Sequence, residues 1–243
     1  MSGFFGILGG LGPQATLNFM QTLIEKTDAS KDQEHMNYIA FQHATIPDRT
    51  AFILKQTDVN PFPYLKEDIK KLESMKVDFI VMPCNTAHYF YNQLQNETSV
   101  PIINMINETI KYIKKKYSVK IKIGVLATEG TIKSNLYYDV MEENGFIVIS
   151  TPIEIQRITN TLIYDQVKKK KELNKEVYLK IINQMISLGC ELIILGCTEL
   201  SVINSNIESL AVSIPIVDAQ RVLVEKTIKL GGKNIVKEHV TTV

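Results

Sequence analysis

The chain has 243 residues, of which 45% are hydrophobic and 22% are charged, and its formal net charge is +1. This balance excludes disordered, collagen-like and coiled-coil proteins, and it allows one large or two small globular domains. The 27 basic and 26 acidic residues nearly cancel, which argues against a nucleic-acid partner and favours a small-molecule ligand.

The N-terminal residues Met1–Gly6 lack the basic and long apolar stretches of a signal peptide. No apolar run approaches the ~20 residues that a membrane-spanning helix needs. We therefore expect a cytoplasmic protein with no membrane partner. Its three cysteines are then expected to be reduced thiols rather than parts of a disulfide framework.

Short aliphatic runs alternate with longer amphipathic stretches, which is typical of an α/β protein with mostly parallel sheets. The expected strands are Phe5–Leu8, Tyr38–Gln42, Phe79–Met82, Ile121–Leu126, Phe146–Ile149 and Leu192–Leu195. Helices are expected between them. The helical spacing of apolar residues is clearest over Pro61–Glu73, Glu176–Leu188 and Ala219–Leu230.

Three segments of the first half recur in the same order in the second half, which indicates an internal repeat. Gly6–Gly10 matches Gly124–Thr128, Asp78–Cys84 matches Glu191–Cys197, and Val100–Asn104 matches Ile214–Asp218. We predict two pseudo-symmetric α/β domains, residues 1–103 and 104–215, with the segment 216–243 returning to the first domain. The active site is expected in the cleft between them.

Two of the cysteines, Cys84 and Cys197, occupy the same position of the repeat, at the end of an apolar strand and before an expected helix. Ligands of parallel sheets bind at the carboxyl ends of strands, and a helix N-terminus there is expected to lower the pKa of a thiol. One such cysteine is as readily a buried apolar residue. Two at equivalent positions suit racemisation, which needs one base on each face of a carbon. Cys190 is matched by Val77 and is assigned to packing.

The residues after each cysteine are suited to holding a carboxylate. Asn85, Thr86 and Thr198 are good helix-capping residues, and the N–H groups of a helix start bind anions. His88 is expected on the same helix face as Cys84, where it could tune the thiol or bond to the core.

Four motifs make the chain resemble the aspartate/glutamate racemase superfamily, and within it the aspartate racemase family. They are GILGGLGP from Gly6, PDRT from Pro47, MPCNTAH from Met82 and LGCTEL from Leu195. The resemblance spans nearly the whole chain. It implies a homodimeric racemase of an acidic amino acid, aspartate before glutamate, which works without PLP, metal or another cofactor.

Residue by residue, the resemblance implies that Cys84 and Cys197 are the proton donor and acceptor. It also implies that Asn85, Thr86 and Ala87 bind the substrate carboxylate.

Two cationic residues enter through the same resemblance. Arg49 matches a substrate-binding arginine, and a lysine of the run Lys168–Lys171 does the same, with Lys168 favoured by its register. Without the motifs, Arg49 would be interpreted as a solvated loop residue and the lysine run as a solvated face.

Other functions remain open at this point. Gly10–Ala15 fits the GxGxxA pattern of a dinucleotide-binding loop, so an NAD(P)-dependent oxidoreductase is an alternative. Against it, Pro13 removes an N–H at the helix start and the second expected strand ends without an acidic residue. A racemase of another amino acid, an isomerase or decarboxylase of small dicarboxylic acids, and a non-catalytic binding module are further alternatives. The four histidines show no metal-binding spacing, so no metal site is predicted.

Overall fold

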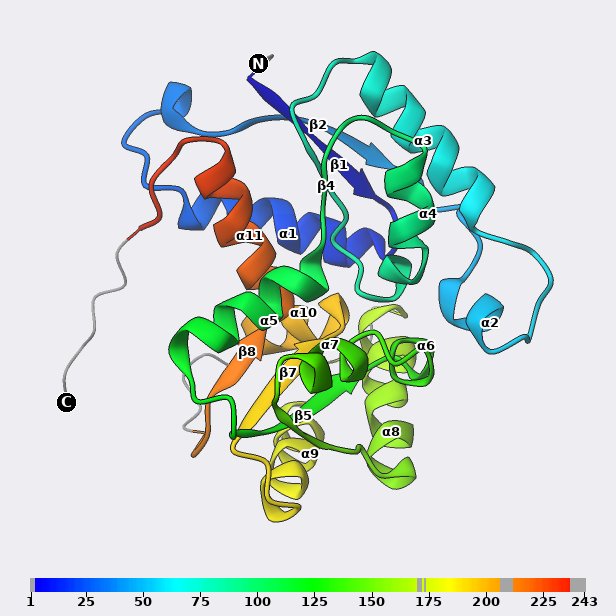
Figure 1. The fold of residues 1–243 in the computed structure, drawn as a ribbon, viewed down its shortest axis with the longest axis vertical. Coiled ribbons are helices and arrows are strands. Elements are labelled where there is room, and N and C mark those ends of the chain that lie inside the picture. Colours follow the sequence, from blue (N-terminus) through cyan, green and yellow to red (C-terminus); the bar gives the residue numbers. More distant parts are fainter. Residues whose placement is uncertain (1–2, 170–171, 173, 206–211, 237–243) are drawn as a thin grey trace.

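The computed structural model describes residues 3–169, 172, 174–205 and 212–236, which form two four-stranded parallel sheets surrounded by helices (Figure 1). Lys170 and Lys171 of the lysine run, and residues 237–243 of the predicted C-terminal segment, lie outside the described residues. No helix within the described ranges is long and apolar enough to cross a membrane.

The two sheets have the same topology, with strand orders β2-β1-β3-β4 and β6-β5-β7-β8. The strands of the first sheet are β1 (Phe4–Gly9), β2 (Asn37–Gln42), β3 (Ile80–Val81) and β4 (Ile102–Ile103), and those of the second are β5 (Lys122–Ala127), β6 (Ile147–Ile149), β7 (Leu192–Gly196) and β8 (Ile216–Asp218). The three matched sequence segments fall on β1 and β5, on β3 and β7, and on β4 and β8. The predicted α/β fold with a repeated unit is therefore confirmed.

Helices connect the parallel strands, as right-handed crossovers of this fold class require. They are α1 (Pro13–Lys26), η1 (Asp32–Glu34), α2 (Arg49–Ile53), α3 (Phe62–Ser74), η2 (Thr86–Phe90), α4 (Tyr91–Asn96), α5 (Met105–Lys116), α6 (Glu129–Lys133), α7 (Tyr138–Glu143), α8 (Ile153–Asn160), η3 (Thr161–Val167), α9 (Lys175–Ser187), α10 (Thr198–Ser205) and α11 (Ala219–Leu230). The short elements η1 and η2 are 3-10 helices, and η3 is a π-helix. The three clearest expected helices correspond to α3, α9 and α11.

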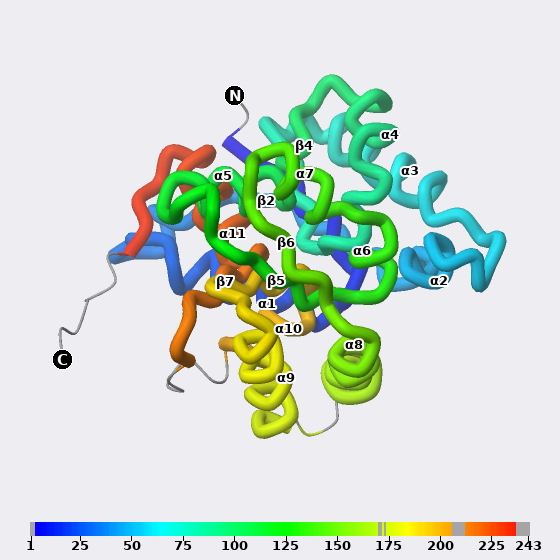
Figure 2. The backbone as a smooth tube through the Cα atoms, turned by 60° about the horizontal axis from the view of Figure 1, so that its bottom comes forward, coloured from blue at the N-terminus to red at the C-terminus, as the bar shows by residue number. Residues whose placement is uncertain are grey.

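The central strands β1, β3, β5 and β7 are buried along almost their whole length, which explains why they are continuous apolar runs rather than alternating ones. Phe5 and Ile7 of β1 face a central core that also receives Val125 of β5. Leu8 faces an outer core under α3, and Leu195 of β7 faces the corresponding outer core with α9. The central core lies between the two sheets and is filled by α1, α5 and α11 (Figures 1 and 2).

The C-terminal segment is shared between the two halves. Strand β8 pairs with β7 in the second sheet, whereas α11 packs against α1 and α5. An isolated antiparallel bridge between Thr27 and Ile235 follows α11 and holds the chain beside the end of α1. Because this segment contacts both halves, it holds them together, with the carboxyl ends of their central strands next to one pocket.

Candidate active site

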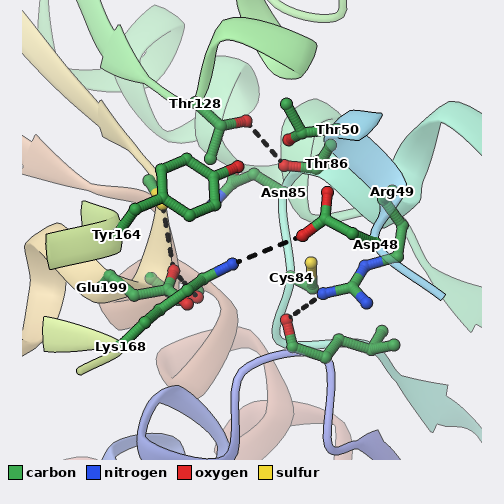
Figure 3. Close-up of a pocket in the computed structure, with 13 residues that line it drawn as sticks. Asp48, Arg49, Thr50, Cys84, Asn85, Thr86, Thr128, Tyr164, Lys168 and Glu199 are labelled. Atoms are coloured by element: carbon green, nitrogen blue, oxygen red, sulfur yellow. Dashed lines mark hydrogen bonds and ion pairs between the residues drawn. The ribbon is translucent and has the colours of Figure 1, made fainter. Parts of the chain in front are cut away.

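A pocket between the two halves lies at the carboxyl ends of the central strands (Figure 3). Its lining residues are Leu11, Asp48, Arg49, Thr50, Cys84, Asn85, Thr86, Thr128, Tyr164, Lys168, Cys197, Thr198 and Glu199. Seven of the eight site residues expected from the sequence are among them. The eighth, Ala87, is fully buried outside the lining, and only its backbone N–H faces the Cys84 thiol.

Each half contributes one thiol to the pocket. Cys84 follows β3 and precedes η2, and Cys197 lies directly between β7 and α10. The Cys197 carbonyl accepts the first backbone hydrogen bond of α10, from Leu200 N–H at 3.0 Å. Both thiols are buried. Cys190 lies apart from them in the outer core of the second half, beside Gly124 and Met185.

His88 holds the backbone of Cys84 in place. Its Nδ1–H donates to the Cys84 carbonyl at 2.8 Å, and its Nε2 accepts from the Met105 N–H at 3.0 Å. This pair of bonds requires the neutral ring. Because the ring is completely buried, its pKa is lowered to about 4. The structure thus favours the core hydrogen-bonding role over direct tuning of the thiol.

Burial of neutral His88 predicts a loss of stability in mild acid. In the unfolded chain, His88 binds a proton below its ordinary pKa near 6.5, whereas in the folded chain it stays neutral down to about pH 4. The free energy of unfolding therefore falls as the pH drops from about 6.5 to about 4. The expected loss is about 3 kcal/mol, measured by urea unfolding from pH 7 to pH 4.5. A His88→Asn variant should be less stable at pH 7 but lose less on acidification. An equal loss in both proteins would contradict this origin.

The acid strength of the two thiols differs from the sequence-based expectation. Burial raises the pKa of Cys84 above its ordinary value, although the Arg49 charge and the Ala87 N–H oppose that rise. Burial also raises the pKa of Cys197, and the neighbouring Glu199 carboxylate raises it further. The prediction of lowered thiol pKa values is therefore wrong for this pocket. Burial is the largest influence on both pKa values, and it acts against the lowering that a helix N-terminus was expected to give.

Arg49 is not the solvated loop residue that its sequence context suggests. It is the first residue of α2, whose N-cap Asp48 accepts from Ala51 N–H, and the residue is only 7% exposed. The guanidinium donates to the carbonyl oxygens of Leu11, Ile46 and Pro47. These bonds fix its position, and its Nε–H has no partner within the described residues.

The two described residues of the lysine run, Lys168 and Lys169, lie in different surroundings. Lys168 follows η3 and lines the pocket, with its Nζ 3.8 Å from Asp48 Oδ2 and 4.4 Å from the centre of the Tyr164 ring (Figure 3). Lys169 points elsewhere and pairs with Asp165 at 2.6 Å in an exposed position. Lys168 therefore bridges the two halves across the pocket.

Three buried polar atoms of the pocket have no hydrogen-bond partner among the described residues. They are Arg49 Nε, Asn85 Nδ2 and the Tyr164 hydroxyl. The Asn85 amide is oriented by Tyr137, whose hydroxyl donates to Asn85 Oδ1 at 2.6 Å. Since buried polar atoms are nearly always paired, three unpaired ones around one pocket indicate a polar ligand.

Three threonine hydroxyls join the halves at the back of the pocket. Thr86 Oγ1 lies 2.9 Å from both Thr128 Oγ1 and Thr131 Oγ1, and the latter two are 3.0 Å apart. Each hydroxyl has one proton, so the ring uses all three as donors. Thr86 can then offer a ligand only its remaining lone pair or its backbone N–H.

Several lining residues were not recognised from the sequence. Thr128 could have been found, because the repeat aligns it with Gly10 at the end of the matching strand. Glu199 lies within the LGCTEL motif and is 5% exposed, and an acidic residue that follows a buried strand so closely was an overlooked signal. Tyr164 had no such signal, because it depends on the π-helix η3, which places Tyr164 and Lys168 over the pocket. Such helices are rare and often lie at functional sites.

The pocket is narrow. Its volume is about 10 Å³, which is room for about one water molecule. An adjoining chamber of about 260 Å³ shares Leu11, Asp48, Arg49, Lys168 and Glu199 with it. A ligand of amino-acid size therefore needs the pocket to open, and the Asp48–Lys168 pair lies where the two spaces meet.

The glycine-rich loop after β1 is explained by contacts within the protein. A Cβ on Gly10 would lie 2.4 Å from the backbone of His43, and one on Gly12 would lie 2.6 Å from Glu199 Oε1. Both glycines are thus needed for close packing, and the loop does not require a dinucleotide. Within the described residues, no group of three or more His, Cys, Asp or Glu side chains is placed to hold a metal ion.

Comparison with known proteins gives consistent similarities. A model of the Asp/Glu/hydantoin racemase family matches residues 8–227. The broad specificity amino-acid racemase RacX of Bacillus subtilis is 32% identical over 226 residues, which is 92% of this chain and 96% of that protein. The structure of an aspartate racemase from Picrophilus torridus superposes with a TM-score of 0.81 at 29% identity, covering 97% of this chain and 96% of that one. An aspartate racemase homologue from Pyrococcus horikoshii gives 0.74 at 26% identity, covering 95% and 99%.

Proposed function

Because the chain belongs to the Asp/Glu/hydantoin racemase family, we propose that it interconverts the enantiomers of a free amino acid with Cys84 and Cys197 as its two acid–base residues. The observation that carries the proposal is the shared pocket, to which each half contributes one buried thiol. The family resemblance further suggests a homodimer that needs no bound cofactor.

The proposed reaction moves one proton at each face of the substrate Cα. One cysteine, as thiolate, takes the α-proton, and the electron pair of the C–H bond passes to Cα and its carboxylate. The other cysteine, as thiol, donates its proton to the opposite face and becomes the thiolate. The unpaired Asn85 Nδ2 and the N–H groups at Thr86 and Thr198 are suited to stabilise the carboxylate charge that develops.

We propose aspartate as the first substrate to test. Arg49 and Lys168 are the two cations of the pocket, and both could face a second carboxylate on the substrate. Arg49 has an unpaired Nε–H for this purpose, and Lys168 could exchange its pairing with Asp48 for the substrate.

A broader range of substrates is the second candidate. Asp48 and Glu199 balance the charges of Arg49 and Lys168, so charge alone does not select an acidic side chain. The adjoining chamber has apolar walls that include Leu11. The similarity to the broad specificity amino-acid racemase of Bacillus subtilis supports this candidate.

The decisive experiment incubates the protein with L-aspartate and a panel of other L-amino acids in D2O, without added cofactor. Optical rotation and Cα deuteration are followed together. Loss of rotation with one deuterium at Cα is the expected result. If no amino acid loses chirality, the proposal fails, and an isomerase or decarboxylase of small dicarboxylic acids, or a binding module, takes its place. Alkylation of the thiols separates these, because a binding module would be unaffected.

A pair of lysine variants tests which side chain the site prefers. Lys168→Met removes a cation from the pocket, whereas Lys169→Met removes the same charge from an exposed position. With aspartate, the KM of Lys168→Met should rise about tenfold or more, the size of one charge-assisted hydrogen bond, and Lys169→Met should match the unmodified protein. With an uncharged amino acid, neither variant should change KM greatly. If Lys168→Met leaves the KM for aspartate unchanged, Lys168 does not bind the side chain.

A further inference from the structure

We propose that Glu199 is a positioning residue that keeps Cys197 protonated, so that Cys84 is the first of the two thiols to act as the base. This inference rests on the proposed racemase function. It adds a residue to which the motif comparison assigned no role, and it assigns a starting protonation state to a pair of thiols that the repeat makes formally equivalent.

The contact between Cys197 and Glu199 is short and shielded. Cys197 Sγ donates to Glu199 Oε2 at 3.0 Å, and the Thr198 hydroxyl lies 3.4 Å from the same oxygen. The other carboxylate oxygen occupies the space that a side chain at position 12 would fill. Gly12 therefore leaves room for the carboxylate, and the loop after β1 holds it against the thiol.

The first half has no acidic counterpart to Glu199. In the repeat, position 199 of the second half corresponds to Thr86 of the first, and the Thr86 hydroxyl is bound in the threonine ring. Cys84 instead faces the Arg49 guanidinium and the Ala87 N–H, which both favour its thiolate. The two-fold symmetry of the thiols is thus broken by one carboxylate on one side and one guanidinium on the other.

Other charged and titratable groups around Cys197 do not reverse this asymmetry. Lys168, beyond the end of η3, lowers the pKa of Cys197, but it also lowers that of Cys84. Tyr164 on η3 and Tyr137 before α7 are neutral, because burial raises the pKa of both hydroxyls. Glu199 likewise raises the pKa of Cys84, yet its hydrogen bond is to Cys197 alone.

A chemical consequence follows for the direction of proton flow. With Cys197 as thiol and Cys84 as the first thiolate, the enzyme is ready for the enantiomer whose α-hydrogen faces Cys84. The other enantiomer must bind the form of the enzyme in which Cys197 is a thiolate. This form is disfavoured because the thiolate and the Glu199 carboxylate are two neighbouring negative charges. Because the equilibrium constant of racemisation is one, kcat/KM must be equal for both enantiomers. The KM values are then expected to differ, since one enantiomer binds a scarcer form.

The test uses the full chain in a Cys84→Ser, Cys190→Ser background, in which Cys197 is the only thiol. Its ionisation is followed by thiolate ultraviolet absorbance and by the rate of iodoacetamide alkylation as the pH is raised. Glu199→Gln keeps the length and an acceptor oxygen but removes the charge, so it should lower the pKa of Cys197 and increase the thiolate fraction near pH 8 about tenfold. Glu143→Gln removes the same charge from an exposed position at the end of α7 and should change nothing.

Glu199→Asp provides a second measurement should the amide variant fail to fold. Its carboxylate is one methylene too short to keep the contact, so the pKa of Cys197 should fall, but less than with glutamine. An unchanged or higher pKa in the variant measured would overturn the proposal. In the protein with all three cysteines, the ratio of the KM values for the two enantiomers should move toward one in Glu199→Gln and stay fixed in Glu143→Gln.

The outcomes separate this inference from the proposed function. If the protein racemises an amino acid but Glu199→Gln leaves the pKa of Cys197 unchanged, the proposed function stands and the inference about Glu199 is wrong. A lowered pKa with an unmoved KM ratio overturns the assignment of Cys84 as the first base. A lowered pKa in a protein that racemises no amino acid confirms the contact and removes the function.

Discussion

Cys84→Ala and Cys197→Ala are each expected to abolish racemisation, whereas Cys190→Ala is expected to keep most of the activity. Removal of a positioned acid or base typically costs about 10²- to 10⁴-fold in rate, and here either loss leaves one face of Cα without a proton carrier. Cys190 lies in the outer core of the second half, where its loss removes only a small apolar group, at a cost of about 1 kcal/mol in stability.

The Cys84→Ala and Cys197→Ala variants allow a sharper measurement than loss of activity. The pocket thiol that remains in each can still take the α-proton of one enantiomer and return deuterium from solvent to the same face. In D2O, Cys84→Ala and Cys197→Ala should therefore each exchange the α-hydrogen of one enantiomer, and of opposite enantiomers, without inversion. Mass spectrometry and chiral chromatography of the same samples measure both properties. Equal loss of activity in Cys190→Ala, or exchange of the same enantiomer by both variants, would contradict the assignment of one thiol to each face.

The fold was predictable because its determinants are local and repeated. The central strands are apolar runs, and the three matched segments place Cys84 and Cys197 at the same strand end in two sheets of the same topology. A repeat states which residues are equivalent without any knowledge of how the halves pack. That is why Cys84, Cys197 and the residues that follow them could be expected at one pocket, whereas Arg49 and Lys168 were suggested only by the family motifs.

The chemistry of the pocket was less predictable, because it depends on how completely the halves exclude water. The helix starts after Cys84 and Cys197 suggested lowered pKa values, but burial of both thiols reverses the direction. Arg49, expected at the surface, is likewise buried and held in place by hydrogen bonds to backbone carbonyl oxygens. Neither the raised pKa of the thiols nor the burial of Arg49 can be predicted from the residues that neighbour them in the sequence. Both result from contacts between loops that are far apart in the chain, such as the contact between Gly12 and Glu199.

The second large effect that we expect is a loss of activity in Arg49→Lys, because Arg49 has an unpaired Nε–H that can bind the substrate. Arg49→Lys keeps the positive charge but cannot satisfy the carbonyl oxygens of Leu11, Ile46 and Pro47 and still offer a directed donor to a substrate. We expect kcat/KM to fall about 100-fold, the size of a lost bond between charged groups. Unfolding free energy should fall by about 1 to 3 kcal/mol, because at least one buried carbonyl is left unpaired. The exposed Arg157→Lys is the matched control and should change neither quantity.

Arg49→Gln separates the charge of Arg49 from its geometry. The guanidinium lowers the pKa of Cys84 against the effect of burial, so its removal should raise that pKa. Since Cys84 must lose its proton to act as a base, the rising limb of kcat/KM against pH should move to higher pH in Arg49→Gln and stay in place in Arg49→Lys. Rate profiles from pH 6 to pH 10 measure the difference. If both variants lose activity without moving the limb, Arg49 binds the substrate but does not influence the ionisation of Cys84.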